Sequence, residues 1–152
     1  MKVNGLPIPE ALVDLISAGV WPATQSVERN QNLEPLLGKE AAHKVSPEDD
    51  RIYLFRPPFY TVDENAKSNP NFWLKSLTNV GEIDYERSVE IADFGLGSDS
   101  SIILNYEVSM EPRVMYLKWS FENGIESNSW VCTHETFEHF ARDVGLESRK
   151  EA

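Results

Sequence analysis

The sequence has only one cysteine, Cys132, among its 152 residues, so no disulfide can form within the chain. It has no uninterrupted apolar segment of the roughly 20 residues that a membrane-spanning helix needs. Its start also lacks the charged and then apolar leader of a secretory signal. We therefore expect a soluble, cytoplasmic protein that is stabilised by a hydrophobic core instead of disulfides.

Basic residues are scarce. The chain has 14 Lys and Arg against 25 Asp and Glu, which gives a net charge of -11. A surface of this sign repels nucleic-acid phosphates and anionic lipid headgroups, so we expect neither nucleic acid nor membrane as a partner. The acidic residues are densest in 82–99, where Arg87 is the only base. That stretch is either a solvated face or a docking surface for a cationic partner. Its acids are Glu82, Asp84, Glu86, Glu90, Asp93 and Asp99.

Catalytic motifs are also missing. Asp93-Phe94-Gly95 is the tripeptide that holds magnesium in protein kinases, but no H-R-D or V-A-I-K pattern precedes it. A phosphate-binding loop would need a third glycine at position 100, which is Ser100, and a helix after the turn. We interpret the stretch as the end of one strand, a turn over 95–99 and a second strand.

No metal or nucleophile site is indicated either. His134 and His139 are five residues apart, whereas H-E-x-x-H zinc sites need a spacing of four, and His43 has no partner ligand. We expect these histidines to be solvated or to cap helices. Cys132 follows Val131 in an apolar run, which favours an inert buried thiol. The sequence therefore predicts a protein that is not an enzyme and has no cofactor or metal.

The first third of the chain predicts one helix and one short strand. Residues 6–22, "LPIPEALVDLISAGVWP", have apolar side chains at helical spacing and Gly19 at the end. Trp21 follows at what we expect to be an exposed helix exit, so it is a candidate binding residue as well as a core residue. Residues 32–45 allow one or two helical turns, 51–56 predict a strand, and 63–71 predict an exposed loop.

The rest of the chain predicts a meander and a final helix. Strand-like runs over 87–95, 101–108, 113–121 and 129–133 are separated by short turn-rich segments, including 122–128. An apolar stripe over 137–144 predicts a helix with Thr133 as N-cap, ended by Gly145. We therefore expect one α+β domain over 1–147, with a mainly antiparallel sheet of about four to six strands, flanking helices, the last helix packed on the sheet, and a frayed tail over 148–152.

The order of these segments resembles the SUKH superfamily, which includes the fungal Smi/Knr cell-wall regulators and many bacterial proteins. The resemblance spans "LPIPEAL", "GVWP", "IYLFRPPF", "IADFGLGSDSSIILNY", "PRVMYLKW" and "SWVCTHETFEHFARDVGL". It implies a single α+β domain with a central antiparallel sheet. It also implies that the protein acts as an immunity protein, binding and neutralising a toxin that is often a nuclease.

Charge and resemblance together suggest one hypothesis. A nuclease toxin needs a cationic groove, and an acidic protein can cover such a groove. The candidate binding residues are Trp21, Glu82, Asp84, Glu86 and Asp99. Two alternatives stay open: a regulatory or scaffold protein of the Smi/Knr type, and an enzyme with an acidic site in which Asp93 and Asp99 converge.

Overall fold

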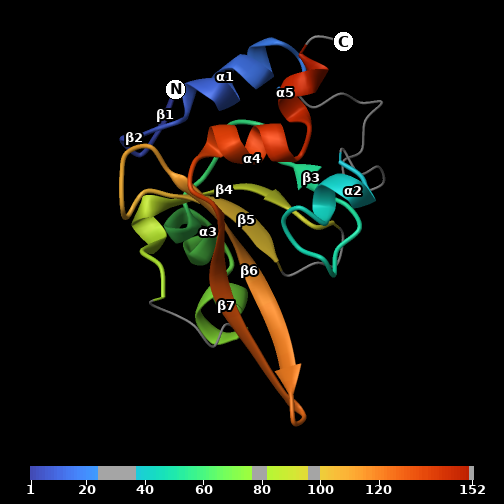
Figure 1. Ribbon diagram of the computed structural model, residues 1–152. Helices are drawn as coiled ribbons and strands as arrows, with labels where there is room; N and C mark the ends of the chain where they lie inside the picture. Colours follow the sequence, from blue (N-terminus) through green and yellow to red (C-terminus); the bar gives the residue numbers. More distant parts are fainter. Residues whose placement is uncertain (24–36, 77–81, 96–99, 151–152) are drawn as a thin grey trace.

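The computed structural model describes residues 1–23, 37–76, 82–95 and 100–150, and Figure 1 shows their arrangement. Five strands form an antiparallel sheet in the order β3-β4-β5-β6-β7. The strands are β3 (Tyr53–Leu54), β4 (Ser88–Asp93), β5 (Ser101–Asn105), β6 (Arg113–Glu122) and β7 (Ile125–His134). The predicted α+β class and antiparallel meander are therefore confirmed. A small hairpin of β1 (Lys2–Val3) and β2 (Leu6–Pro7), which the sequence did not predict, precedes the sheet.

Both faces of the sheet are covered by helical segments. Ile102 and Leu104 of β5 and Tyr106 just after it belong to one hydrophobic cluster, and Ile103 belongs to another. The first cluster packs against α1 (Glu10–Ser17), α2 (Lys39–Ala42), α4 (Phe137–Asp143) and α5 (Leu146–Arg149). The second packs against α3 (Val62–Ser68), the π-helix η1 (Asn71–Ser76) and the 3-10 helix η2 (Tyr85–Arg87).

Trp21 lies in the core, so its predicted exposure is wrong. Its side chain is 0% exposed and its Nε1–H donates to the Phe55 carbonyl at 2.7 Å. The indole meets the rings of Phe59 and Phe137 edge-on. The backbone N–H groups of Val20 and Trp21 both donate to the Leu15 carbonyl. This turn after α1 precedes an indole that packs in the same hydrophobic cluster as Leu12 and Leu15 of the helix.

The predicted exposed loop over 63–71 is also wrong, because most of it is helix α3. Thr61 caps that helix: its Oγ1 accepts from the Glu64 N–H at 3.1 Å, and the Glu64 carboxylate accepts from the Thr61 N–H at 3.1 Å. This is a capping box, whose T-x-x-E signal is present in the sequence at 61–64. Asn65 and Ser68 of this helix line a pocket on the side of the second cluster.

The hairpin of β6 and β7 is longer than predicted. Instead of a loop over 122–128, the strands continue to a two-residue turn at Asn123 and Gly124, with Glu122 paired to Ile125. Both turn residues have positive φ, 52° and 77°, as a type I′ turn requires and as Asn-Gly favours. Each strand has ten residues, whereas β4 has six and β5 has five. The hairpin therefore projects beyond the sheet as an arm (Figure 1).

The C-terminal helix packs on the sheet as predicted, with Phe137, Phe140 and Ala141 buried. Its N-cap is Thr136 and not Thr133, because β7 continues to residue 134. Gly145, with φ of 84°, ends the helix. Residues 148 and 149 of the predicted frayed tail belong to α5, and 151–152 lie outside the described residues. No helix in the described part of the chain is both long and apolar enough to cross a membrane.

Candidate functional site

The structure does not bring the predicted binding residues into one site. Trp21 is in the core, and Asp99 lies outside the described residues. The Glu82 carboxylate accepts a hydrogen bond from the Trp130 N–H, on the outer edge of β7. Asp84 caps η2 by accepting from the Glu86 N–H at 2.9 Å. Of the described candidates, Glu82, Asp84 and Glu86 are exposed, but the first two have structural hydrogen bonds.

The acidic stretch is also not one continuous surface, because Glu90 and Asp93 turn inward. In a regular strand, residues three apart point to opposite faces. Here β4 has a bulge at Ile91: Glu90 pairs with Ile103, Ala92 with Ile102 and Asp93 with Ser101. The extra residue places both carboxylates on the same face of the sheet, the face of the second cluster. Bulges commonly re-aim side chains in this way next to functional sites.

Glu90 and Asp93 line a pocket of about 470 Å³ between the sheet and α3. Its walls also include aromatic rings from the segment after β3 and from η1, which are Phe55, Phe72 and Trp73. Asn65 of α3 donates to the Glu90 carboxylate at 2.5 Å. The described residues that line this acidic pocket include no lysine or arginine. Sequence reasoning missed this pocket because the bulge has no signal in the sequence.

Burial determines the protonation of the two carboxylates. Desolvation raises the pKa of Glu90 above its ordinary value, although hydrogen bonds from Ser101 and Asn65 act in the opposite direction. Desolvation raises the pKa of Asp93 from 3.8 to about 6, partly offset by the hydrogen bond from the Gly95 N–H. The Asp93 charge also raises the pKa of Glu90. The pocket is thus a place where negative charge is poorly solvated.

We predict that Asp93→Asn stabilises the protein at pH 8. Because the folded-state pKa is raised, the native state binds the Asp93 proton more tightly, and stability falls as the pH rises from about 4 through about 6. The amide removes this penalty, about 1–2 kcal/mol after allowance for partial exposure, and keeps an oxygen for the Gly95 N–H. Urea unfolding at pH 8 and at pH 4 measures the change in the free energy of unfolding. Glu86→Gln, which removes an exposed carboxylate, is the control.

At pH 4 most of this gain is expected to be absent, because Asp93 is then protonated in the folded state and about half protonated in the unfolded state. A gain that is equal at the two pH values would contradict the assignment of the raised pKa to Asp93. A gain of the same size in Glu86→Gln would attribute the effect to the overall charge of the protein.

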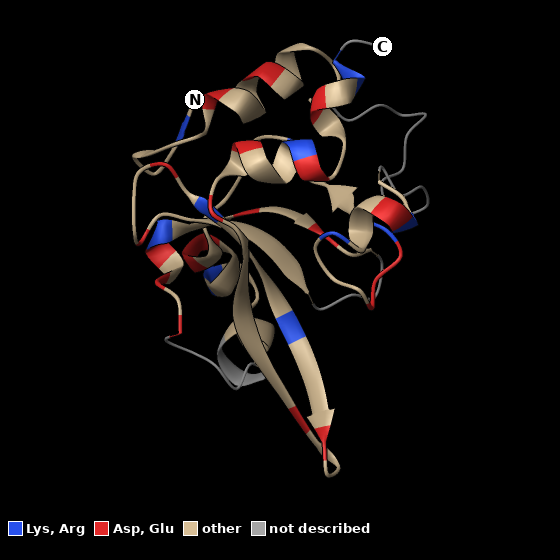
Figure 2. Ribbon diagram, in the orientation of Figure 1, with Lys and Arg blue, Asp and Glu red and all other residues tan. Residues whose placement is uncertain are grey.

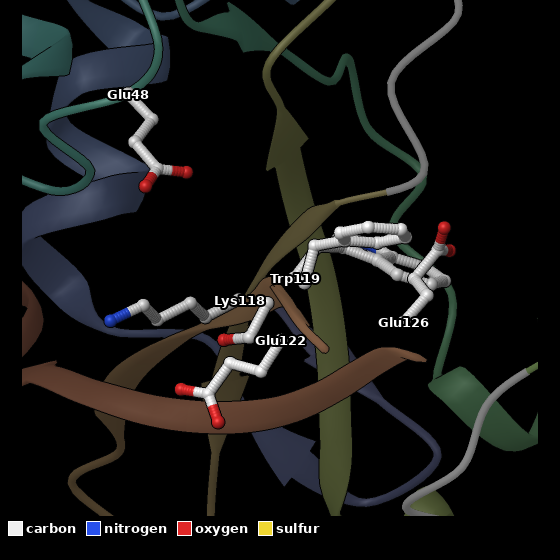
Figure 3. Close-up of a pocket in the computed structure, with 7 residues that line it drawn as sticks. Glu48, Lys118, Trp119, Glu122 and Glu126 are labelled. Carbon is white, nitrogen blue, oxygen red and sulfur yellow. The ribbon is translucent and has the colours of Figure 1, made fainter. Parts of the chain in front are cut away.

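The β6–β7 arm and the groove beside it are a second candidate site, after the acidic pocket. Figure 3 shows Lys118 and Trp119 pointing to opposite sides of β6, with Glu126 on the side of Trp119 and Glu48 on the side of Lys118. The groove has a volume of about 660 Å³, and three carboxylates and one ammonium line it: Glu48, Glu122, Glu126 and Lys118. Figure 2 shows the acidic residues at the tip of the arm.

The tip of the arm also exposes two large apolar side chains. Phe121 is 70% exposed and Ile125 is 69% exposed. They lie on opposite faces of the hairpin, since Phe121 pairs with Glu126 and Ile125 pairs with Glu122. An apolar side chain therefore stands beside a carboxylate on each face. The sequence signal for this arm is the Asn-Gly pair at 123–124, which lies within the predicted loop over 122–128.

Cys132 and His134 differ from the predictions. Cys132 is exposed on the edge strand β7 and is not a buried thiol. His134 is buried, not solvated: its Nε2 lies 2.8 Å from the Asp143 carboxylate and its Nδ1 lies 2.9 Å from Thr133 Oγ1. The network ties α4 to the end of β7. Within residues 1–23, 37–76, 82–95 and 100–150, no group of three or more His, Cys, Asp or Glu is placed to hold a metal ion.

Comparison of the chain with protein-family models, with curated proteins and with solved structures finds no match.

Proposed function

We propose that this protein is a non-enzymatic SUKH-type immunity protein, which neutralises a cationic toxin, such as a nuclease, by forming a one-to-one complex through its β6–β7 arm. The observation behind the proposal is that Phe121 and Ile125 are exposed at the tip of a projecting hairpin and are flanked by Glu122 and Glu126. Interfaces commonly have such an arrangement, with apolar anchors inside a polar rim.

Charge complementarity determines the kind of partner. The net charge of -11 and the carboxylates of the groove favour a basic surface, and such attraction raises the rate of association. Phe121 and Ile125 supply apolar contact area once the partner has docked. A toxin that acts on nucleic acid has a basic surface for its substrate, so the arm and groove can cover that surface.

The immunity role itself is supported by the order of the elements in the sequence, which resembles the SUKH superfamily. The regulatory alternative differs in the identity of the partner alone. The enzymatic alternative required Asp93 and Asp99 to converge, and Asp99 lies outside the described residues. The enzymatic alternative differs from the immunity role in the amount of protein needed, because an enzyme turns over and acts at amounts well below those of the toxin.

The test is co-expression with the toxin domain that a neighbouring gene encodes. We expect cells to survive when the two proteins are produced in equal amounts and to die when the toxin is in excess, because each molecule neutralises one toxin. Protection at amounts far below those of the toxin would support the enzymatic alternative. Failure to protect against any neighbouring toxin would support the regulatory one.

A further inference from the structure

The acidic pocket combines features that the proposed function does not use. It places two carboxylates, Glu90 and Asp93, against the rings of Phe55, Phe72 and Trp73. Its volume of about 470 Å³ lies within the range of roughly 300–1,000 Å³ that is typical of small-molecule sites. The bulge in β4 creates this arrangement, since a regular strand would point one of the two carboxylates to the other face of the sheet.

A cation with an apolar body matches this lining. The two carboxylates repel each other, and the described lining residues contain no basic side chain to offset them. Ring faces attract cations, most strongly when water is excluded. The side-chain oxygens of Asn69 and Ser68, which also line the pocket, can accept hydrogen bonds from N–H groups. A bare metal ion would leave the aromatic walls without a contact.

We propose that the acidic pocket binds a monovalent organic cation, namely a primary ammonium or guanidinium group on a short apolar chain. The charged head lies between Glu90 and Asp93, and the chain lies against Phe72 and Trp73. Such a head occurs both on free amines and on the lysine or arginine side chains of a protein. The pocket is separate from the arm, so this proposal does not depend on the proposed function.

The test uses n-butylamine and n-propylguanidine as probes, with 1-butanol as the uncharged analogue of the amine. Binding is measured at pH 7.5, above the pKa of about 6 of Asp93, by calorimetry and by shifts of backbone amide signals in NMR spectra. We expect saturable binding of the two cations, with the largest shifts at Asn65, Asn69 and Trp73. We expect at least about tenfold weaker binding of 1-butanol, since charge-assisted hydrogen bonds are lost.

Two variants test whether the cations bind in the acidic pocket. Glu90→Gln combined with Asp93→Asn is expected to weaken cation binding by about tenfold or more, while Phe72→Leu keeps both carboxyl groups and removes one ring. Glu86→Gln removes an exposed carboxylate outside the pocket and is expected to bind as the natural protein does. Should the double variant unfold, Phe72→Leu decides: an unchanged affinity in that variant overturns the proposal.

The source of the cation is distinguished by two further probes. n-Pentylamine represents a free amine, and an acetylated and amidated Gly-Lys-Gly peptide represents a protein side chain; each carries one ammonium group. Tighter binding of the peptide assigns the pocket to a lysine of a protein partner, and tighter binding of n-pentylamine assigns it to a free amine. Equal binding of 1-butanol and n-butylamine, or amide shifts spread over the exposed acids instead of the pocket, would overturn the proposal.

Discussion

Replacement of Trp21 by alanine is expected to lower the free energy of unfolding by about 3–5 kcal/mol. The indole is fully buried, packs edge-on against Phe59 and Phe137, and donates its N–H to the Phe55 carbonyl. Its removal leaves a cavity between α1, α4 and the sheet, and leaves the carbonyl without its partner. Because small domains have a stability of only about 5–15 kcal/mol, this change is a large fraction of the total.

Urea unfolding followed by circular dichroism measures the effect of the Trp21 change, and two variants separate its causes. Trp21→Phe keeps an aromatic ring and loses the hydrogen bond to the Phe55 carbonyl. The part of its decrease in the free energy of unfolding that is due to this bond is expected to be on the order of 1 kcal/mol. Trp119→Ala removes an indole that is only partly buried and is expected to cost less. A larger loss in Trp119→Ala than in Trp21→Ala would contradict the placement of Trp21 in the core.

Local patterns predicted the sheet well, because its signal is short-range. The predicted strand over 101–108 has apolar residues at alternate positions, Ile102, Leu104 and Tyr106, and the structure places all three in one cluster. The same holds for the stripe of α4, from Phe137 to Ala141. In each case the residues that decide the structure are neighbours in the sequence.

Trp21 and the acidic pocket were missed because they depend on contacts between distant segments. Whether Trp21 faces solvent is decided by Phe59 and Phe137, which lie far along the chain. The shared face of Glu90 and Asp93 is decided by how β4 pairs with β5, and the single extra residue of a bulge reverses the alternation. The capping box at Thr61 and the Asn-Gly turn are different, because their signals are local and present in the sequence, T-x-x-E at 61–64 and Asn-Gly at 123–124.

Changing the arm is expected to weaken partner binding by about a hundredfold or more without unfolding the protein. Phe121→Ser with Ile125→Ser removes two exposed apolar anchors, and losses of about 2 kcal/mol or more at each anchor are typical of interface hot spots. Because both side chains are largely exposed, the free energy of unfolding is expected to change little. Calorimetric titration of the toxin domain measures the affinity, and urea unfolding provides the control.

Charge-reversal variants of the acidic stretch identify an interface only where the replaced side chain makes no structural hydrogen bond. Glu82→Lys and Asp84→Lys would break the contact with Trp130 and the cap of η2, so a loss of binding in those variants would not identify an interface. Glu86→Lys changes the charge without removing such a contact and serves as the matched control for Glu122→Lys with Glu126→Lys. If Glu86→Lys weakened binding as much as the change in the arm, the docking surface would lie at η2 instead.

The rate constant of association with the toxin domain, measured by stopped flow from 20 mM to 500 mM NaCl, tests the docking claim most directly. For the natural protein we expect the rate to fall by about tenfold or more over this range, because salt screens attraction between exposed charges. The Glu122→Lys, Glu126→Lys variant is expected to associate slowly at low salt and to depend weakly on salt. A rate that is independent of salt, or equal in the variant and the natural protein, would contradict docking through the acidic arm.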